Sequence, residues 1–208
     1  KFDHPITIIG AGGIGGPVVL MLAKLGLTDI TVIDFDKVEE HNQPNQIFGP
    51  PDVGLPKVRQ LLAIVKELTG TTIKTHEVKI TDKNALEYLG GIVISAVDSM
   101  EARNIIFAST NMNPKVQLLI DGRLGGEYLA LYTCRTLIDA DRREYTTKLV
   151  KDDKVIELPC TARAIIDVGF IMGALITRAV RHWIKDARRE FEVLFDVNNL
   201  VVLKQEEK

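Results

Sequence analysis

A glycine-rich segment near the start of the chain constrains the fold most. Residues 6–36 read ITIIGAGGIGGPVVLMLAKLGLTDITVIDFD, which is an apolar run, a glycine turn, a helical pattern and a second apolar run. Gly10, Gly12 and Gly15 fit G-x-G-x-x-G, in which glycines permit a tight turn, let backbone N–H groups approach phosphate and allow close helix–strand packing. The segment therefore predicts a βαβ unit that binds a nucleotide at its first turn.

Acidic residues follow the second apolar run. Asp34 lies about 20 residues after the glycines, a spacing at which a carboxylate reaches the ribose hydroxyls of a bound nucleotide. The N-terminus of the intervening helix adds a partial positive charge that favours phosphate. Together these features predict a nucleotide site, and they leave open which nucleotide binds.

The composition is that of an ordinary globular protein. The chain has 208 residues, of which 46% are apolar and 26% charged, and its net charge of −2 gives no general attraction to nucleic acid or an anionic membrane. No apolar stretch is long enough to cross a bilayer and no signal peptide is apparent, so we expect a cytoplasmic protein. Two cysteines, Cys134 and Cys160, are too few for a disulfide framework or a four-cysteine zinc site. No structural zinc is expected.

Apolar runs and helical patterns alternate through the first half of the chain. Strands are expected at residues 6–9, 30–33, 91–97 and 116–120, with helices between them at 15–25, 57–68 and 99–110. Such alternation implies right-handed crossovers, a parallel sheet and a ligand at the carboxyl ends of the strands. Gly10, Asp34 and Asp98 all follow such strand ends.

The second half has a different pattern. Residues 127–132 predict an antiparallel strand, and the charged residues 135–159 predict a mobile loop. Residues 161–187 predict a long apolar helix, and residues 191–195 and 200–203 predict a closing hairpin. The expected fold class is α/β, with a Rossmann-like, mostly parallel sheet flanked by helices and an antiparallel extension on the C-terminal side.

The order of five motifs is more specific than any one of them. GAGGIGG is followed by DFDKVEEHNQPNQ, DVGLPKV, AVDSMEARN and a late cysteine before VGFIMGALI. This order resembles the ThiF/MoeB superfamily of ubiquitin-activating-enzyme-like adenylyltransferases, from about Ile6 to Trp183. The resemblance implies one adenylation domain over residues 1–208 and a homodimer. It also implies that ATP and Mg²⁺ are used to adenylate the C-terminal glycine of a β-grasp ubiquitin-like or sulfur-carrier protein.

The resemblance also assigns roles to individual residues. Those matched to nucleotide binding span the glycine loop, the D-x-D pair, the S-N-x-x-R-Q motif and the lysine of G-x-P-K-V: Gly10, Gly12, Gly13, Gly15, Asp34, Asp36, Asn42, Asn45, Gln46 and Lys57. Asp98 matches the magnesium-binding aspartate of D-N-x-x-x-R, and Arg103 matches its arginine. Lys57, Asp98 and Arg103 are thus the expected catalytic residues.

The chemistry explains these residue types. Charge builds on phosphate oxygens as pyrophosphate leaves, and a lysine and a metal held by a carboxylate can neutralise it. A C-terminal carboxylate is already ionised at neutral pH, so no general base is needed. Other interpretations remain: Asp98 could be only a helix N-cap, and Lys57 could be solvated.

One departure from the family bears on activity. Asn45 stands where the family has the arginine of S-N-x-x-R-Q, and the sequence has no counterpart of the N-terminal helix that supplies an arginine to a neighbouring subunit. Either another base such as Arg103 compensates, or the protein is a weakened relative that acts as a nucleotide- or carrier-binding scaffold. A third interpretation is an NAD-dependent oxidoreductase, against which Lys57 and Asp98 suit a triphosphate better than a dinucleotide.

The two cysteines differ in context. Cys160 precedes the expected long helix, where a helix N-terminus can lower a thiol pKa. In the resembling family, a cysteine at a similar place sometimes forms a sulfur link to the activated carrier. Cys160 is therefore either an acceptor or a buried thiol, whereas Cys134 has no expected role.

Overall fold

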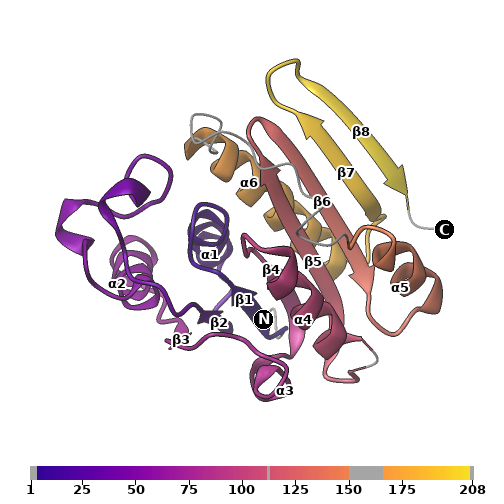
Figure 1. Cartoon of the computed structure of the whole chain (residues 1–208), viewed down its shortest axis with the longest axis horizontal. Helices are drawn as coiled ribbons and strands as arrows, with labels where there is room; N and C mark the ends of the chain where they lie inside the picture. The colour runs from indigo at the N-terminus through magenta and orange to yellow at the C-terminus, as the bar shows by residue number, and fades with distance from the viewer. Residues whose placement is uncertain (1–3, 112, 150–165, 207–208) are drawn as a thin grey trace.

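A computed structural model describes residues 4–111, 113–149 and 166–206. They form one eight-stranded sheet in the order β3-β2-β1-β4-β5-β6-β7-β8, with helices on both faces (Figure 1), which confirms the predicted fold class. The strands are β1 (Ile6–Ile9), β2 (Ile30–Ile33), β3 (Lys74–His76), β4 (Gly91–Ser95), β5 (Val116–Gly125), β6 (Tyr128–Arg135), β7 (Glu190–Asp196) and β8 (Val201–Glu206). The helices are α1 (Gly15–Lys24), α2 (Lys57–Thr69), α3 (Ala85–Tyr88), α4 (Met100–Thr110), α5 (Asp139–Thr146) and α6 (Ile166–Ile184). Short 3₁₀ turns, η1 (Glu40–Asn42) and η2 (Pro50–Asp52), lie between β2 and α2.

The parallel half of the sheet reverses its strand order at β1. This strand pairs in parallel with β2 on one side and with β4 on the other, so that Ile9 lies between Ile33 and Ser95. The crossovers after β1 and β4 leave toward opposite sides, which opens a crevice at the carboxyl ends of these two strands. The glycine turn and Asp98 both follow strands that border this crevice.

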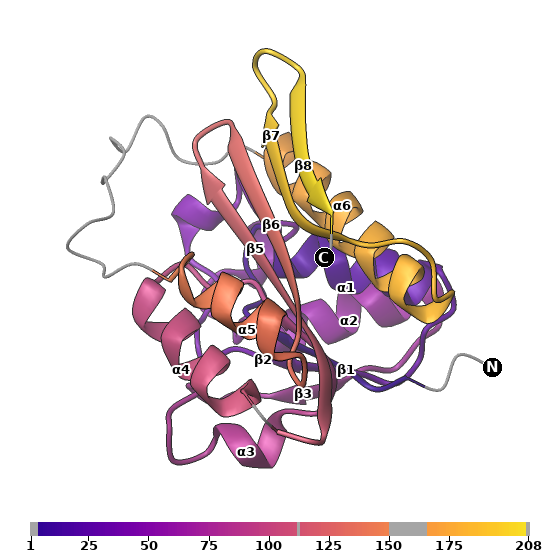
Figure 2. The same ribbon diagram turned by 90° about the vertical axis from the view of Figure 1, so that its right-hand side faces the viewer.

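The antiparallel half extends the sheet from β5 to β8. The strand predicted at 116–120 continues to Gly125, because β6 pairs with it from Leu118↔Arg135 to Gly125↔Tyr128. The predicted C-terminal hairpin is confirmed as β7 and β8, which project beyond the rest of the sheet (Figure 2). β5 therefore joins the parallel half to the antiparallel half.

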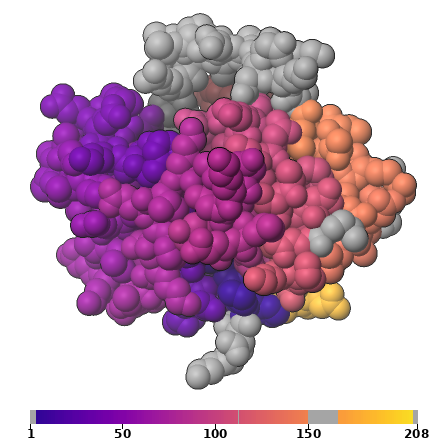
Figure 3. Space-filling model, turned by 60° about the horizontal axis from the view of Figure 1, so that its bottom comes forward, coloured from indigo at the N-terminus to yellow at the C-terminus, as the bar shows by residue number. Residues whose placement is uncertain are grey.

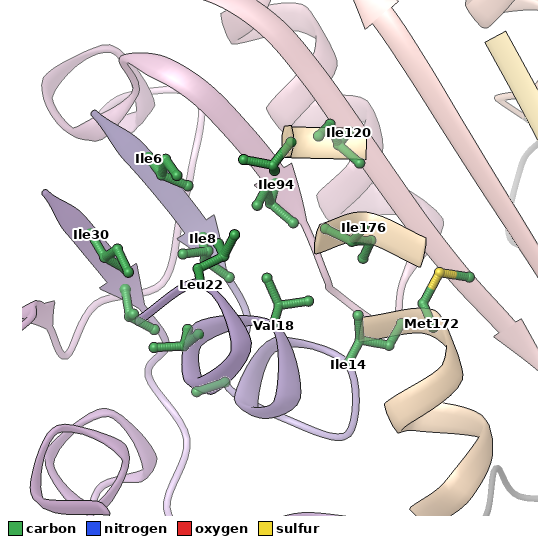
Figure 4. Packing of buried hydrophobic residues seen from close by; sticks show 14 of the residues in the cluster. Ile6, Ile8, Ile14, Val18, Leu22, Ile30, Ile94, Ile120, Met172 and Ile176 are labelled. Atoms are coloured by element: carbon green, nitrogen blue, oxygen red, sulfur yellow. The ribbon is translucent and has the colours of Figure 1, made fainter. Parts of the chain in front are cut away.

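Two hydrophobic clusters cover the two faces of the sheet. On one face α1 and α6 lie side by side, and Val18, Met172 and Ile176 point into the same cluster as the strand isoleucines (Figure 4). The other face carries α3, α4 and α5, where the Phe107 and Tyr145 rings lie 4.9 Å apart. On the surface of the molecule, α3 and α4 lie in the middle of one side with α5 beside them (Figure 3). Among the described residues, none of the helices combines the length and the apolar character of a membrane-spanning segment.

The glycines of α6 serve packing within the chain. A Cβ added to Gly169 would lie 2.4 Å from the Gly13 carbonyl oxygen, and one added to Gly173 would lie 3.0 Å from Pro17 Cβ. Close approach of α6 to the glycine turn and to α1 therefore requires these small residues. The long helix was predicted at residues 161–187, and its first five positions lie outside the described residues.

One prediction was wrong in the second half. The charged segment 135–159 was expected to be a mobile loop, but Asp139–Thr146 forms α5. Acidic residues in its first turn suit the helix dipole, and Asp141 accepts hydrogen bonds from the Arg135 backbone and guanidinium. Tyr145 is buried against the sheet, so the helix is amphipathic despite its polar composition. Residues 150–159 lie outside the described part.

Candidate active site

A pocket of about 640 Å³ opens at the carboxyl ends of the parallel strands. This volume suits a small-molecule ligand. Residues predicted for binding or catalysis line it from five separate segments: Gly10, Gly12, Gly13, Asp34, Asp36, Asn45, Gln46, Lys57, Asp98 and Arg103. Two further predicted residues, Gly15 and Asn42, are described by the structure and do not line it.

The glycines of the first turn have distinct roles. Gly10 has φ +99°, and a Cβ there would lie 2.5 Å from the Ala96 carbonyl oxygen. A Cβ on Gly15 would lie 1.8 Å from the Gly10 carbonyl oxygen, so Gly15 serves packing of the turn. A Cβ on Gly12 would meet nothing nearer than 3.7 Å, at Gln46 Nε2. Gly12 therefore has room for a methyl group beside the Gln46 amide, and it lines the pocket where a phosphate is expected to approach backbone N–H groups.

Asp34 is held rigidly at the end of β2. It is 8% exposed, its Oδ2 accepts a hydrogen bond of 2.7 Å from Ala11 N, and its Oδ1 accepts one of 2.8 Å from Asp36 N. Burial raises the pKa of the Asp34 carboxyl above its usual value, although the two backbone hydrogen bonds oppose the shift. Because a carboxylate oxygen accepts more than one hydrogen bond, each oxygen can also take a ribose hydroxyl.

Lys57 is a buried cation at the pocket wall. It is the first residue of α2 and is 7% exposed, so the interpretation of a solvated lysine is wrong. Its Nζ lies 3.0 Å from Asp36 Oδ2, and its backbone N–H donates to the Asp36 carbonyl oxygen. The half-exposed Asp36 side chain thus holds Lys57 at the pocket wall, where the ammonium can meet an anionic ligand.

Asp98 is not the cap of the helix that follows it. The N-cap of α4 is Ser99, whose Oγ accepts a hydrogen bond of 3.2 Å from Ala102 N. Asp98 itself is exposed and lines the pocket. Within the described ranges, no three His, Cys, Asp or Glu side chains gather to hold a metal ion. A magnesium ion shared between one carboxylate and the phosphates of a ligand needs no such group.

Arg103 forms part of the pocket wall and is 4% exposed. Its Nε donates to Asp121 Oδ1 over 3.0 Å, and its Nη2 donates to the Gly122 carbonyl oxygen over 2.9 Å. A further bond of 3.3 Å joins Nη1 to the Ser99 carbonyl oxygen. These bonds fix the guanidinium between α4 and β5.

The segment after Asp36 contributes unevenly. Asn42 is buried, and its Oδ1 accepts a hydrogen bond of 2.9 Å from Glu39 N, so it supports the turn η1 and stands apart from the pocket. Asn45 and Gln46 line the pocket, and their side-chain oxygens are buried without hydrogen-bond partners among the described residues. Buried acceptors of this kind are normally paired, so hydroxyl or amino groups of a nucleotide fit this site.

Residues 2–118 match the sequence profile of the ThiF family, which is more than half of the chain. The chain belongs to the ThiF family. Adenylyltransferase and sulfurtransferase MOCS3 of Aedes aegypti is 35% identical over 105 residues, which cover 49% of this chain and 24% of that protein. Ubiquitin-like modifier-activating enzyme 5 of Branchiostoma floridae is 24% identical over 200 residues, which cover 86% of this chain and 49% of that protein.

Solved structures show the same fold as this ThiF-family chain. E. coli MccB, crystallised with AMPCPP and MccA, is 16% identical with a TM-score of 0.74, and the match covers 99% of this chain and 64% of MccB. E. coli tRNA N6-threonylcarbamoyladenosine dehydratase, TcdA, is 22% identical with a TM-score of 0.67, covering 89% of this chain and 86% of TcdA. The chain spans about a quarter to a half of the length of the two curated relatives.

The ThiF-family motifs did not reveal every residue of the pocket. Phe35, Lys79 and Glu101 also line it. Lys79 Nζ lies 5.6 Å from the centroid of the Phe35 ring, which is 53% exposed. The place of Phe35 between two predicted acids was a usable signal. No sequence signal indicated Lys79, because its place in the pocket depends on the path that the chain takes after β3.

The two cysteines of this ThiF-family chain lie in different parts of the structure. Cys134 is fully buried in β6, and burial raises the pKa of its thiol to about 12. A thiol with such a pKa is neutral and inert at physiological pH. Cys160 lies outside the described residues, so its acceptor role stays a prediction.

Proposed function

We propose that this ThiF-family chain uses ATP to adenylate the C-terminal glycine of a ubiquitin-like or sulfur-carrier protein. The observation that carries the proposal is the convergence of the glycine turn, Lys57 and Asp98 on one pocket at the strand-order reversal. A turn that presents backbone N–H groups, a buried ammonium and an exposed carboxylate together suit a polyphosphate with a divalent cation.

The proposed reaction transfers the adenylyl group of ATP to a carboxylate. An oxygen of the ionised C-terminal carboxylate attacks the α-phosphorus of ATP, and the bond to the oxygen that bridges the α- and β-phosphates breaks. Pyrophosphate leaves with that electron pair, and no proton is transferred. Lys57 stabilises the charge that develops on the phosphate oxygens. When bound, Mg²⁺ would add positive charge at the same oxygens, and Asp98 is the residue that would hold it.

Calorimetry and isotope exchange test this proposal together. We expect ATP–Mg²⁺ to bind in the pocket more tightly than NAD, and a β-grasp carrier ending in glycine to drive exchange of labelled pyrophosphate into ATP. Binding of NAD in place of ATP would support the oxidoreductase interpretation. Binding of ATP without exchange, for every carrier tried, would favour the scaffold interpretation.

The variant Asn45→Arg tests whether the missing family arginine limits the rate. Asn45 lines the pocket next to the glycine turn, so an arginine there could contact phosphate oxygens bidentately. We expect the exchange rate to stay within about threefold of the parent, because another base such as Arg103 supplies the positive charge that the family arginine would bring. A rise of about tenfold or more would show that no other residue compensates for the missing family arginine.

We further propose a cytoplasmic homodimer, as the family resemblance implies. Gly169 and Gly173 are explained by packing of α6 within the chain, so these small residues give the homodimer no support. Light scattering at micromolar concentration should give twice the mass of the chain. A monomer across the accessible concentration range would contradict the homodimer and leave the adenylation proposal intact.

A further inference from the structure

A buried charge cluster lies directly behind Arg103. At its centre is Asp121 of β5, which is fully buried. The Asp121 carboxylate accepts hydrogen bonds from Arg103 Nε over 3.0 Å and from Arg123 Nε over 2.7 Å. A third bond of 2.9 Å comes from the Tyr145 hydroxyl of α5. The cluster therefore ties α4, β5 and α5 together on the side of the sheet that borders the pocket.

The cluster carries one net positive charge. Burial raises the pKa of Tyr145 well above its usual value, and Asp121 adds to the shift, so the phenol is neutral and donates its proton. Burial disfavours the charged form of Arg123, but the interactions with Asp121 and Tyr145 together outweigh burial and raise the arginine pKa. Two guanidinium groups thus share one carboxylate.

The second arginine, Arg123, changes the balance of charge at the pocket. Four acids line the pocket, Asp34, Asp36, Asp98 and Glu101, against three bases, Lys57, Lys79 and Arg103. A pocket with an excess of acid is unfavourable for a polyphosphate. If Asp121 were paired with Arg103 alone, its carboxylate would cancel the charge of Arg103, which is one of the three bases that line the pocket. Arg123 balances Asp121 and leaves the charge of Arg103 effective at the wall.

Arg123 acts from behind the wall, because among the described residues it does not itself line the pocket. Its Nη1 donates to the Lys148 carbonyl oxygen over 2.8 Å, and its guanidinium carbon lies 4.6 Å from the centroid of the Tyr132 ring. Its Nη2 is buried without a hydrogen-bond partner in the described structure. A cation held in such surroundings is weakly screened by water, so its field extends into the neighbouring site.

We propose that Arg123 is a positioning residue that keeps the charge of Arg103 available to the nucleotide and thereby compensates for Asn45. The nature of the ligand rests on the proposed function, whereas the charge balance rests on Asp121 and the two arginines. Arg123 touches neither nucleotide nor carrier in this arrangement. It acts by balancing the charge of Asp121, so that the guanidinium charge of Arg103 is not cancelled.

Calorimetric binding of ATP–Mg²⁺ to purified variants tests the proposal without any carrier. We expect Arg123→Gln to weaken binding by about tenfold, since one unit of weakly screened charge is lost beside the site. The matched control is Arg135→Gln, which breaks the ion pair between Arg135 and Asp141 at the same helix α5. The control should bind ATP–Mg²⁺ within about threefold of the parent. Equal affinity of Arg123→Gln and the parent would overturn the inference.

A double substitution separates charge from structure. Removing Asp121 together with Arg123, in D121N/R123Q, restores the net charge of the cluster, so we expect the affinity to return to within about threefold of the parent. A purely structural role for Arg123 predicts further loss instead, which would overturn the inference. If R123Q alone does not fold, the comparison of D121N with D121N/R123Q measures the same charge, and D121N should bind about tenfold more tightly.

Compensation for Asn45 is tested in the same background. Asn45→Arg should raise the affinity of the R123Q protein by about tenfold, although it changes the parent little. An identical effect of Asn45→Arg in both backgrounds would show that the two positions are independent. Failure of every carrier to support pyrophosphate exchange would reject the proposed function while leaving these binding results to decide on Arg123.

Discussion

Replacing Lys57 with alanine is expected to slow carrier-dependent exchange of labelled pyrophosphate into ATP by about 10²-fold or more, the loss typical of a charge-stabilising group. The buried ammonium at the pocket wall is lost, and Asp36 is left as an unbalanced carboxylate beside the phosphates. Asp98→Ala should have a similar effect, because it removes the carboxylate proposed to hold magnesium.

The control for this experiment is a lysine on the same helix. Lys66 is exposed near the end of α2, so Lys66→Ala should leave the exchange rate within about twofold of the parent. Unfolding in urea would confirm that both variants are folded. If Lys57→Ala and Asp98→Ala exchanged as fast as the parent, the assignment of the active site would be wrong.

The glycine turn gives the second large effect. In Gly15→Ala the new Cβ would lie 1.8 Å from the Gly10 carbonyl oxygen, so the backbone of the turn must move. We expect the free energy of unfolding to fall by about 3 kcal/mol, at the upper end of overpacking costs. The displaced turn should also lose its affinity for ATP.

Gly12→Ala is the matched substitution three residues earlier. Its Cβ meets no protein atom closer than 3.7 Å, so the free energy of unfolding should change by less than about 1 kcal/mol. The methyl group would occupy space where phosphate approaches, so ATP affinity should fall by about tenfold or more. Urea unfolding and calorimetry on the same samples separate the two effects. Equal loss of stability in both variants would contradict the distinct roles of these glycines.

Local signals explain why much of the pocket could be predicted. A glycine turn, an acid after a strand and a lysine at a helix start each depend on a few neighbouring residues. The parallel sheet then brings Gly10, Asp34 and Asp98 to one edge, because all three follow carboxyl ends of strands. Prediction from the sequence was therefore reliable wherever a short motif and strand order together determined position.

Features that depend on tertiary packing could not be predicted from the sequence. The helix α5 has a polar composition typical of a loop, and its only large buried side chain, Tyr145, is held by Asp121 across the sheet face. Asn42 matched a family motif, yet its side chain caps a turn. The pairing of Arg123 with Asp121 next to Arg103 needs β5 and α4 to be in place first, so no local pattern signals it.

The change of pairing direction at β5 has a consequence for how the chain folds. Contacts from β5 to β8 include tight hairpins, such as Gly125 with Tyr128 and Asp196 with Val201, which close over short loops. Contacts such as Ile6 with Ile92 join segments that are far apart in sequence, and their loop-closure entropy is greater. Pairing of Tyr128 in β6 with Asp196 in β7 is also long-range, so the short closures of the antiparallel half are its two hairpins, β5–β6 and β7–β8. The crevice between β1 and β4 lies at a pairing of this long-range kind, so we expect ATP to bind only after these two strands have paired.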